Sequence, residues 1–203
     1  MSETNVVRCI EGRNLYLRPI DPRTDAERYY RWMNDPEVTR WLLHPLPMPY
    51  SAEVRYLESV TSERPTTDYV FAIVLHENDE HIGSVGIHRI DWISRTGSNG
   101  IMIGAPQHWR KGYGFTAKML ILRFAFQTLG LRKVASSVLA GNIASRQNLL
   151  KQGYREIGRR RAQFLRDGVF HDEILMELFA EEFANVWERY RATVLPAPAI
   201  SAT

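Results

Sequence analysis

The spacing of apolar and polar residues divides the chain into short strands and amphipathic helices. Alternation with a period of two predicts a strand, and apolar positions three or four residues apart predict a helix. Strands are expected at 14–20, 69–76, 82–92, 100–104 and 133–139, with two more flanking Asp167-Gly168, a strong hairpin signal. Helices are expected at 23–33, 51–60, 113–129 and 144–152, and from about residue 181. This order predicts an α/β fold with a mixed sheet.

The sequence says more about the helices expected at 113–129 and 51–60 and about the loop that precedes 51–60. Segment 113–129 is apolar on nearly all sides, which is typical of a buried helix. The helix at 51–60 has Glu53 in its first turn, where a negative charge is favourable. Before that helix, Pro45, Pro47 and Pro49 prevent regular structure and predict a fixed loop.

Length and composition indicate one globular domain. The chain has 203 residues, 44% of them apolar and 24% charged, which is ordinary for a soluble protein. We expect a single domain over 1–193 with its core at 14–183, and a disordered tail at 194–203. The single cysteine, Cys9, excludes an internal disulfide, and no apolar run is long enough to cross a membrane. The N-terminal stretch lacks the apolar segment of a signal peptide, so a cytoplasmic location is expected.

The small net charge of +3 conceals an uneven distribution. Residues 105–166 carry thirteen Lys and Arg against the single acid Glu156, a net charge of +12. Residues 14–70 carry −2 and residues 167–203 carry −5. Because self-repulsion destabilises a compact state, a band of this size indicates an anionic ligand, either a nucleic acid or a cofactor that bears phosphate.

A glycine-rich loop within the basic band is suited to phosphate. It runs from Trp109 to Gly114, between the strand at 100–104 and the buried helix. Glycines let backbone N–H groups approach an anion, the following helix N-terminus is partly positive, and Arg110 and Lys111 add full charges. No Gly-Lys-Ser/Thr follows, so the loop is not the P-loop of nucleotide hydrolases.

Residues 112–117 also match the dinucleotide fingerprint G-x-G-x-x-G/A. The context is unfavourable, because the strand ends well before Gly112, with Pro106 between them. Arg132 and Lys133 stand where an acidic residue should hold the ribose. An NADP-linked oxidoreductase is therefore kept as a lower-ranked hypothesis.

A second motif lies downstream, where Asn142 and Ser145 are good helix caps and are followed by Lys151, Gly153 and Tyr154. Together with the glycine loop, this ordered set resembles the GNAT superfamily of acyl-CoA-dependent N-acyltransferases. The similarity is greatest to its ribosomal-protein-alanine N-acetyltransferase branch, and it extends over residues 14–183. It implies a mostly antiparallel sheet of six to seven strands, flanked by helices, with two splayed central parallel strands.

The resemblance also implies the roles of individual residues. Acetyl-CoA would lie between the splayed strands, with its pantetheine arm along 101–104 and its pyrophosphate on 110–116. Asn142 would hydrogen-bond the pantetheine, and Ser145 would donate a proton to the departing thiolate. The residues assigned to the cofactor are Ile101, Met102, Ile103, Trp109, Arg110, Lys111, Gly112, Tyr113, Gly114, Phe115, Thr116, Asn142, Ser145, Arg146 and Lys151.

The sequence leaves the general base open. Members of the family often carry Glu at two positions that Ser98 and Thr116 occupy here. Either a carboxylate from elsewhere or a chain of water molecules must act as the base. The nearest candidates are two pairs, His171 with Asp172 and His88 with Asp91, and Asp172 is therefore a candidate catalytic residue. The six histidines show no metal-ligand spacing, so no metal is expected.

The expected reaction is transfer of acetyl from acetyl-CoA to a primary amine by direct attack in a ternary complex. The sequence does not identify the amine, which could be a ribosomal protein N-terminus, an amino sugar, an aminoglycoside or a polyamine. Transfer of a larger acyl group such as succinyl stays open, and so does a homodimer. A non-enzymatic nucleic-acid binder is a lower-ranked alternative. Alternate residues of a strand point to opposite faces, so Arg159 and Arg161 cannot share a binding face with Arg160. Such a binder would rely on five arginines without another explanation, Arg155, Arg159, Arg160, Arg161 and Arg166.

Overall fold

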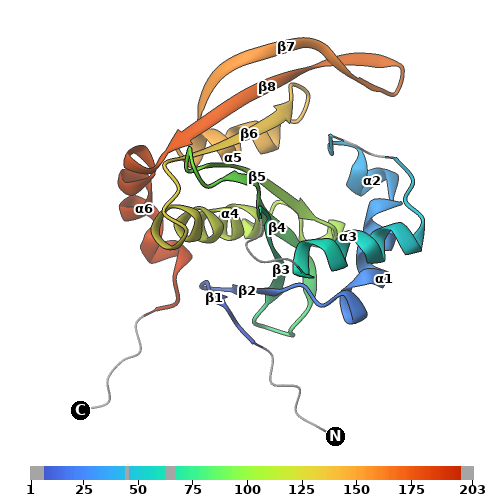
Figure 1. The fold of residues 1–203 in the computed structure, drawn as a ribbon, viewed down its shortest axis with the longest axis horizontal. Helices are drawn as coiled ribbons and strands as arrows, with labels where there is room; N and C mark the ends of the chain where they lie inside the picture. The colour runs from blue at the N-terminus through green and yellow to red at the C-terminus, as the bar shows by residue number, and fades with distance from the viewer. Residues whose placement is uncertain (1–6, 44–45, 63–66, 198–203) are drawn as a thin grey trace, which may run out of the picture.

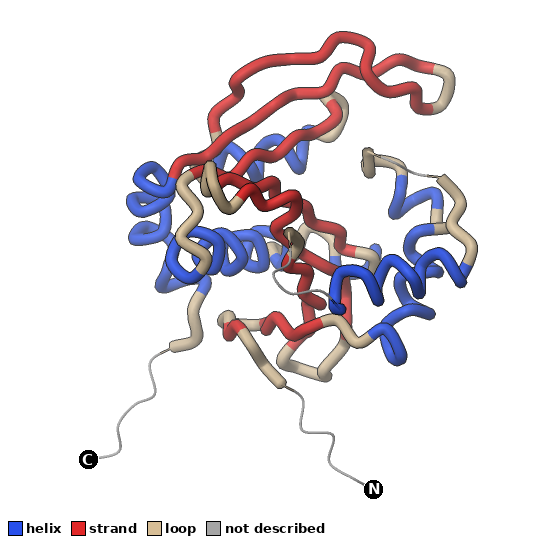
Figure 2. Tube along the Cα trace, in the orientation of Figure 1, coloured by secondary structure: helices blue, strands red, loops and turns tan. Residues whose placement is uncertain are grey.

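The protein is described here by a computed structural model, which covers residues 7–43, 46–62 and 67–197. Its centre is one sheet with the strand order β1-β2-β3-β4-β5-β6-β8-β7 (Figures 1 and 2). The strands are β1 (Ile10–Glu11), β2 (Leu15–Pro19), β3 (Tyr69–Leu75), β4 (His81–Asp91), β5 (Thr96–Ile103), β6 (Lys133–Leu139), β7 (Arg155–Arg166) and β8 (Val169–Phe179). The expected mixed, mostly antiparallel sheet is confirmed. The eighth strand is the two-residue β1, too short for any periodicity to predict.

The helices lie on both faces of the sheet. They are α1 (Pro22–Met33), α2 (Pro36–Thr39), α3 (Tyr50–Ser62), α4 (Tyr113–Arg123), α5 (Ile143–Lys151) and α6 (Ala180–Val194). A 3₁₀ turn, η1 (Pro106–His108), precedes α4. The single helix expected at 113–129 instead changes to a π-helical segment, η2 (Phe124–Thr128), where Phe124 packs edge-on against Phe71 of β3.

Side-chain alternation along the strands divides the core in two. Leu15 and Leu17 of β2 belong to the larger cluster, which is built around α4 and α6. Tyr16, between them, belongs to the smaller cluster with α1 and α3 on the other face. This is the division that the period of two predicts for a sheet covered on both sides.

The only parallel pair among the described strands, β5 and β6, is joined over just three residues. Thr96 to Ser98 pair with Lys133 to Ala135, after which β5 continues to Ile103 and β6 to Leu139 without pairing to each other. Beyond Ser98 the two strands diverge, as expected, and the space between their unpaired ends is the splay. β5 also begins four residues before the expected start, because its antiparallel partner β4 supports a small, polar stretch that shows no alternation.

The C-terminal boundary differs slightly from the expected tail at 194–203. Val194 is buried and still part of α6, and its carbonyl accepts a hydrogen bond of 2.7 Å from the Arg13 amide. Residues 198–203 lie outside the described residues.

A buried charged network fixes α1 to the sheet. The Asp25 carboxylate is fully buried and accepts hydrogen bonds from Arg18 of β2 at 2.7 and 2.8 Å, and it lies 3.1 Å from Nδ1 of His81 on β4. Burial alone would raise the pKa of Asp25, but the bonds from Arg18 and His81 outweigh it and hold that pKa well below its usual range. Asp25 therefore stays ionised and links one helix to two strands.

Replacing Asp25 by Asn should lower the free energy of unfolding by about 3 kcal/mol, because Arg18 then loses its buried partner. Since the folded-state pKa is lowered, this contribution is present at neutral pH and is lost as the pH falls below about 4. Urea unfolding at pH 7 measures the change. Arg23→Ala, which removes the exposed pair with Asp21, is the control and should change stability by under about 0.5 kcal/mol. Equal effects of the two variants would contradict the assigned role of Asp25.

Candidate active site

The glycine loop leads directly into α4 at the open side of β5. Gly112 is the N-cap of α4 and has a φ of +85°, a conformation that L side chains rarely adopt. Within the described residues, no side chain caps this helix, so none accepts a hydrogen bond from its first N–H groups. The indole of Trp109 donates a 2.8 Å hydrogen bond to the Ile103 carbonyl, which ties the loop to the end of β5. The arrangement is suited to an anion at the start of α4.

The second motif forms the N-terminus of α5, across the splay from the loop. The Asn142 side chain accepts a 3.1 Å hydrogen bond from the Ser145 amide, so Asn142 caps α5. The ammonium of Lys151 lies 4.5 Å from the ring centre of Phe115, in the first turn of α4. Arg146 pairs with Glu156 at 2.9 Å. The structure thus places Lys151 near the glycine loop and engages Arg146 elsewhere.

Most of the five unexplained arginines have partners within the protein. Three of them pair with acids, Arg155 with Glu182 at 2.8 Å, Arg159 with Asp172 at 3.3 Å and Arg160 with Glu173 at 2.8 Å. Arg166 donates to the carbonyls of Leu42 and Leu43 at 2.7 and 2.8 Å. Because β7 pairs with β8, the positive band lies beside the acidic C-terminal segment. These contacts explain much of the band without a nucleic acid.

One further cation of the band is inside the core. Lys118 of α4 is 4% exposed, and burial lowers its pKa to about 7. It therefore adds less than a full positive charge at neutral pH.

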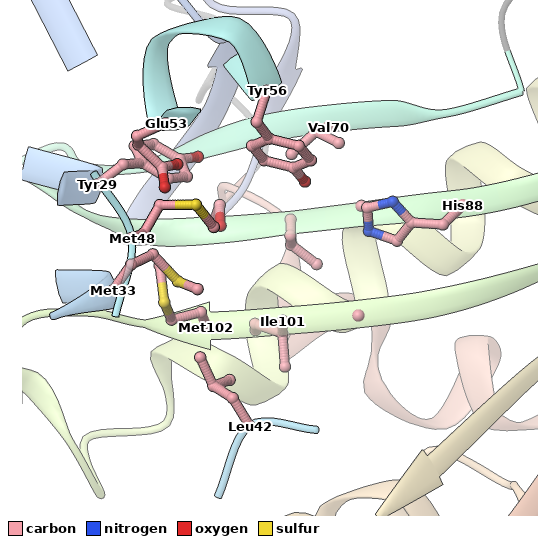
Figure 3. A pocket seen from close by; sticks show the side chains of 14 residues that line it. Tyr29, Met33, Leu42, Met48, Glu53, Tyr56, Val70, His88, Ile101 and Met102 are labelled. Atoms are coloured by element: carbon pink, nitrogen blue, oxygen red, sulfur yellow. The ribbon is translucent and has the colours of Figure 1, made fainter. Parts of the chain in front are cut away.

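A cavity of about 330 Å³ lies on the other side of β5, between the sheet and the helices α1 and α3 (Figure 3). Gly100, Ile101 and Met102 of β5 form part of its wall, so this strand separates the cavity from the splay. The rest of the lining is mainly aliphatic and aromatic, with two ionisable side chains other than tyrosine. The remaining lining residues are Tyr29, Met33, Leu42, Met48, Glu53, Tyr56, Val70, Ser84, Val85, Gly86 and His88.

His88 enters the cavity from β4, and its partner is Asp68. Its Nδ1 lies 2.9 Å from the Asp68 carboxylate, so Nε2 is the ring nitrogen free to act in the cavity. Two glycines provide the space, because a Cβ at Gly86 would lie 2.9 Å from Nε2 and one at Gly100 would lie 3.4 Å from it. His88 is also in register with Ser98, one of the two positions where the family resemblance would place a Glu.

The expected pairing of His88 with Asp91 is wrong. A register irregularity follows His88, and Arg89 has a φ of +51°. Asp91 consequently turns away and accepts hydrogen bonds from the amides of Ile93 and Ser94, which hold the next turn. The pairing with Asp68 depends on sheet register and could not be found by proximity in the sequence.

The other expected histidine pair does not line the cavity. Asp172 accepts hydrogen bonds from the Ala162 amide at 2.8 Å and from Arg159, and these bonds lower its pKa. His171 packs edge-on against Trp41. Asp172 therefore positions the β7–β8 hairpin, and its lowered pKa makes it a weak base.

Glu53 is the residue that the sequence interpretation missed. The sequence indicated only a favourable position for it in the first turn of a helix, but it is 1% exposed. Its spacing of four residues from Leu57, which is fully buried, was the available signal that it lies on the inner face of α3.

The described residues contain no group of three His, Cys, Asp or Glu side chains placed to hold a metal ion. The same part of the chain has no helix that is both long and apolar enough to cross a bilayer.

Comparison with known proteins identifies the class to which this fold and site belong. The domain model of the GNAT acetyltransferases matches residues 14–155, and the chain belongs to this family. It is an acetyl-CoA-dependent N-acetyltransferase by family.

Two curated relatives match along most of their length. One is the N-acetyltransferase p20 of Bacillus licheniformis, itself uncharacterized, which is 25% identical over 79% of this chain and 90% of its own. The other is the candidate ribosomal N-acetyltransferase YdaF of Bacillus subtilis (strain 168), which is 26% identical over 86% of this chain and 96% of its own.

Solved structures share the fold. Spermidine N-acetyltransferase from Vibrio cholerae, in complex with CoA and spermine, superposes with a TM-score of 0.76 at 22% identity, covering 85% of this chain and 99% of its own. A GCN5-related N-acetyltransferase from Brucella melitensis gives 0.74 at 18% identity, over 94% of this chain and 90% of its own.

Replacing Gly112 by Val should weaken CoA binding by at least about tenfold, because the loop loses the backbone conformation that directs its N–H groups. Gly130→Val is the matched control, since Gly130 also has a positive φ and open space around it but lies at the far end of the helix. Titration calorimetry with CoA measures binding, and thermal unfolding measures the strain common to both variants. Equal losses of CoA affinity would count against the loop as the phosphate site.

Proposed function

We propose that this protein transfers the acetyl group of acetyl-CoA to a primary amine bound in the cavity, by direct attack within a ternary complex. The observation that carries the proposal is the position of β5. One edge of this strand is open to the splay, and its residues Gly100 to Met102 form a wall of the cavity. A thioester held along β5 would therefore be within reach of an amine in the cavity.

The cofactor would be held by the residues that the family resemblance indicates. The pantetheine arm pairs with 101–104, the pyrophosphate lies on 110–116, and backbone N–H near Ile103 stabilises the oxyanion. The side-chain oxygen of Asn142 caps α5, so its side-chain nitrogen is left to donate a hydrogen bond to the pantetheine. Ser145 donates a proton to the departing sulfur.

His88 is the proposed general base, oriented by Asp68. The amine nitrogen attacks the thioester carbon while Nε2 of His88 accepts the amine proton. The carbon–sulfur bond then breaks, Ser145 protonates the thiolate, and solvent returns the proton from His88 to Ser145. The products are the N-acetylated amine and CoA. Asp172 has no part in this scheme.

Ser145→Ala should lower kcat for thiol release by about 10²-fold, because the leaving sulfur loses its proton donor. Asn148→Ala, on the same helix and exposed, is the control and should leave kcat unchanged. Thiol release from acetyl-CoA is measured with an amine panel, and a parallel series with succinyl-CoA tests the larger acyl group. Activity that persists in Ser145→Ala would remove Ser145 from the scheme. Acetyl-CoA that neither raises Tm nor releases thiol with any amine would overturn the proposed function.

His88→Gln should lower kcat by about 10²-fold with little change in KM for acetyl-CoA, since the base contacts the amine and not the cofactor. The loss should shrink as the pH rises, because hydroxide then increasingly takes the amine proton in place of the imidazole. His76→Gln is the control, as His76 pairs with Glu11 outside the cavity. A pH-rate profile that keeps its shape in His88→Gln would show that another group removes the proton.

A further inference from the structure

Glu53 has no hydrogen-bond partner in the described part of the chain. It is 1% exposed, and its Oε2 has no donor within reach. Burial raises the pKa of the Glu53 carboxyl, because no cation compensates for the lost hydration. Buried polar groups in proteins are almost always paired, so an unpaired carboxylate facing a cavity indicates a ligand that donates to it.

Glu53 and His88 lie at opposite ends of the cavity (Figure 3). The Glu53 end is next to Tyr29 of α1 and Met48. Along β4, the wall extends from Ser84, in register with Met102, to His88. Four residues of strand span about 13 Å, so the two ends are separated by roughly the length of a short alkyl chain with a polar group at each end.

The middle of the cavity is apolar. Val70 of β3 lines it together with Gly86 and Gly100, which are paired with each other, and the backbones of β4 and β5 there are already bonded to each other. The hydroxyl groups of an amino sugar or an aminoglycoside, or the amides of a peptide, would lose hydration in this section without gaining partners. Methylene groups fit it at no such cost.

We propose that the acceptor is an alkyl diamine, with one amine at His88 and the second held as an ammonium ion by Glu53. This inference rests on the proposed function and names its substrate class. The ammonium donates to the Glu53 carboxylate, and Tyr29 and Tyr56, which line the cavity with it, offer aromatic surface to the same cation. The aliphatic chain crosses the apolar middle. The ion pair also removes the cost of an unpaired buried carboxylate.

The test compares two acceptors with the same five-carbon chain, 1,5-diaminopentane and 1-aminopentane. Each is assayed with the wild type, Glu53→Gln and Glu58→Gln. Glu58 lies on the same helix but is exposed, so its variant makes the same change of charge without touching the cavity. The wild type should prefer the diamine by about tenfold or more in kcat/KM, the gain of one charge-assisted contact. Glu53→Gln should bring this ratio to about one by lowering kcat/KM for the diamine alone, and Glu58→Gln should keep the wild-type ratio.

Because the two acceptors are compared within each variant, a partial folding defect cancels from the ratio. Calorimetric titration of 1,5-diaminopentane without acetyl-CoA gives a readout independent of turnover, and binding should be lost in Glu53→Gln only. Diamines from 1,3-diaminopropane to 1,8-diaminooctane then give the preferred spacing.

The outcomes separate this inference from the proposed function. If the wild type uses the two amines equally, or if Glu53→Gln lowers both to the same degree, the diamine assignment is wrong and acetyl transfer stands. If no amine releases thiol from acetyl-CoA in the wild type, the proposed function fails, and the diamine assignment fails with it.

Discussion

The short pairing of β5 with β6 is the constraint on which the rest of the site depends. Two parallel strands that stayed in register would leave no space between them, but here the ladder ends after Ser98. The two strands then direct different helix N-termini towards the opening, α4 beside β5 and α5 after β6. The same divergence leaves β5 bonded to β4 on one side only, so a single strand separates the opening from the cavity. The proposed ternary complex depends on this geometry.

Two buried carboxylates near α1 show how the same chemical group can serve structure or binding. Asp25 is surrounded by Arg18, His81 and a backbone amide, and all its bonds are made within the protein. Glu53 is almost as deeply buried but faces the cavity without a donor. The physical difference is in the pKa, which partners lower for Asp25 and burial raises for Glu53. A satisfied charge stabilises the fold, whereas an unsatisfied one is paid for by the rest of the core until a ligand pairs with it.

The positive band at 105–166 has two physical origins. Part of it is the exposed loop with Arg110 and Lys111, to which the proposed function assigns the pyrophosphate. Another part is structural, because antiparallel pairing brings the arginines of β7 beside the acids of β8 and α6. Arg166 extends the same hairpin to the carbonyls of Leu42 and Leu43, which follow α2. Counting charge by segment cannot separate these contributions, since the compensating acids are remote in sequence.

The sequence by itself determined the elements, the mixed sheet and the glycine loop, because periodicity, helix caps and glycine placement are local properties. It also supplied the ordered motifs that indicate acetyl-CoA. Tertiary structure decided the partner of His88, since a strand irregularity turns Asp91 away and sheet pairing brings in Asp68 from twenty residues earlier. It also decided that Glu53 faces a cavity, because burial depends on what packs against a helix face. Contacts between segments are set by register and packing, which no local pattern encodes.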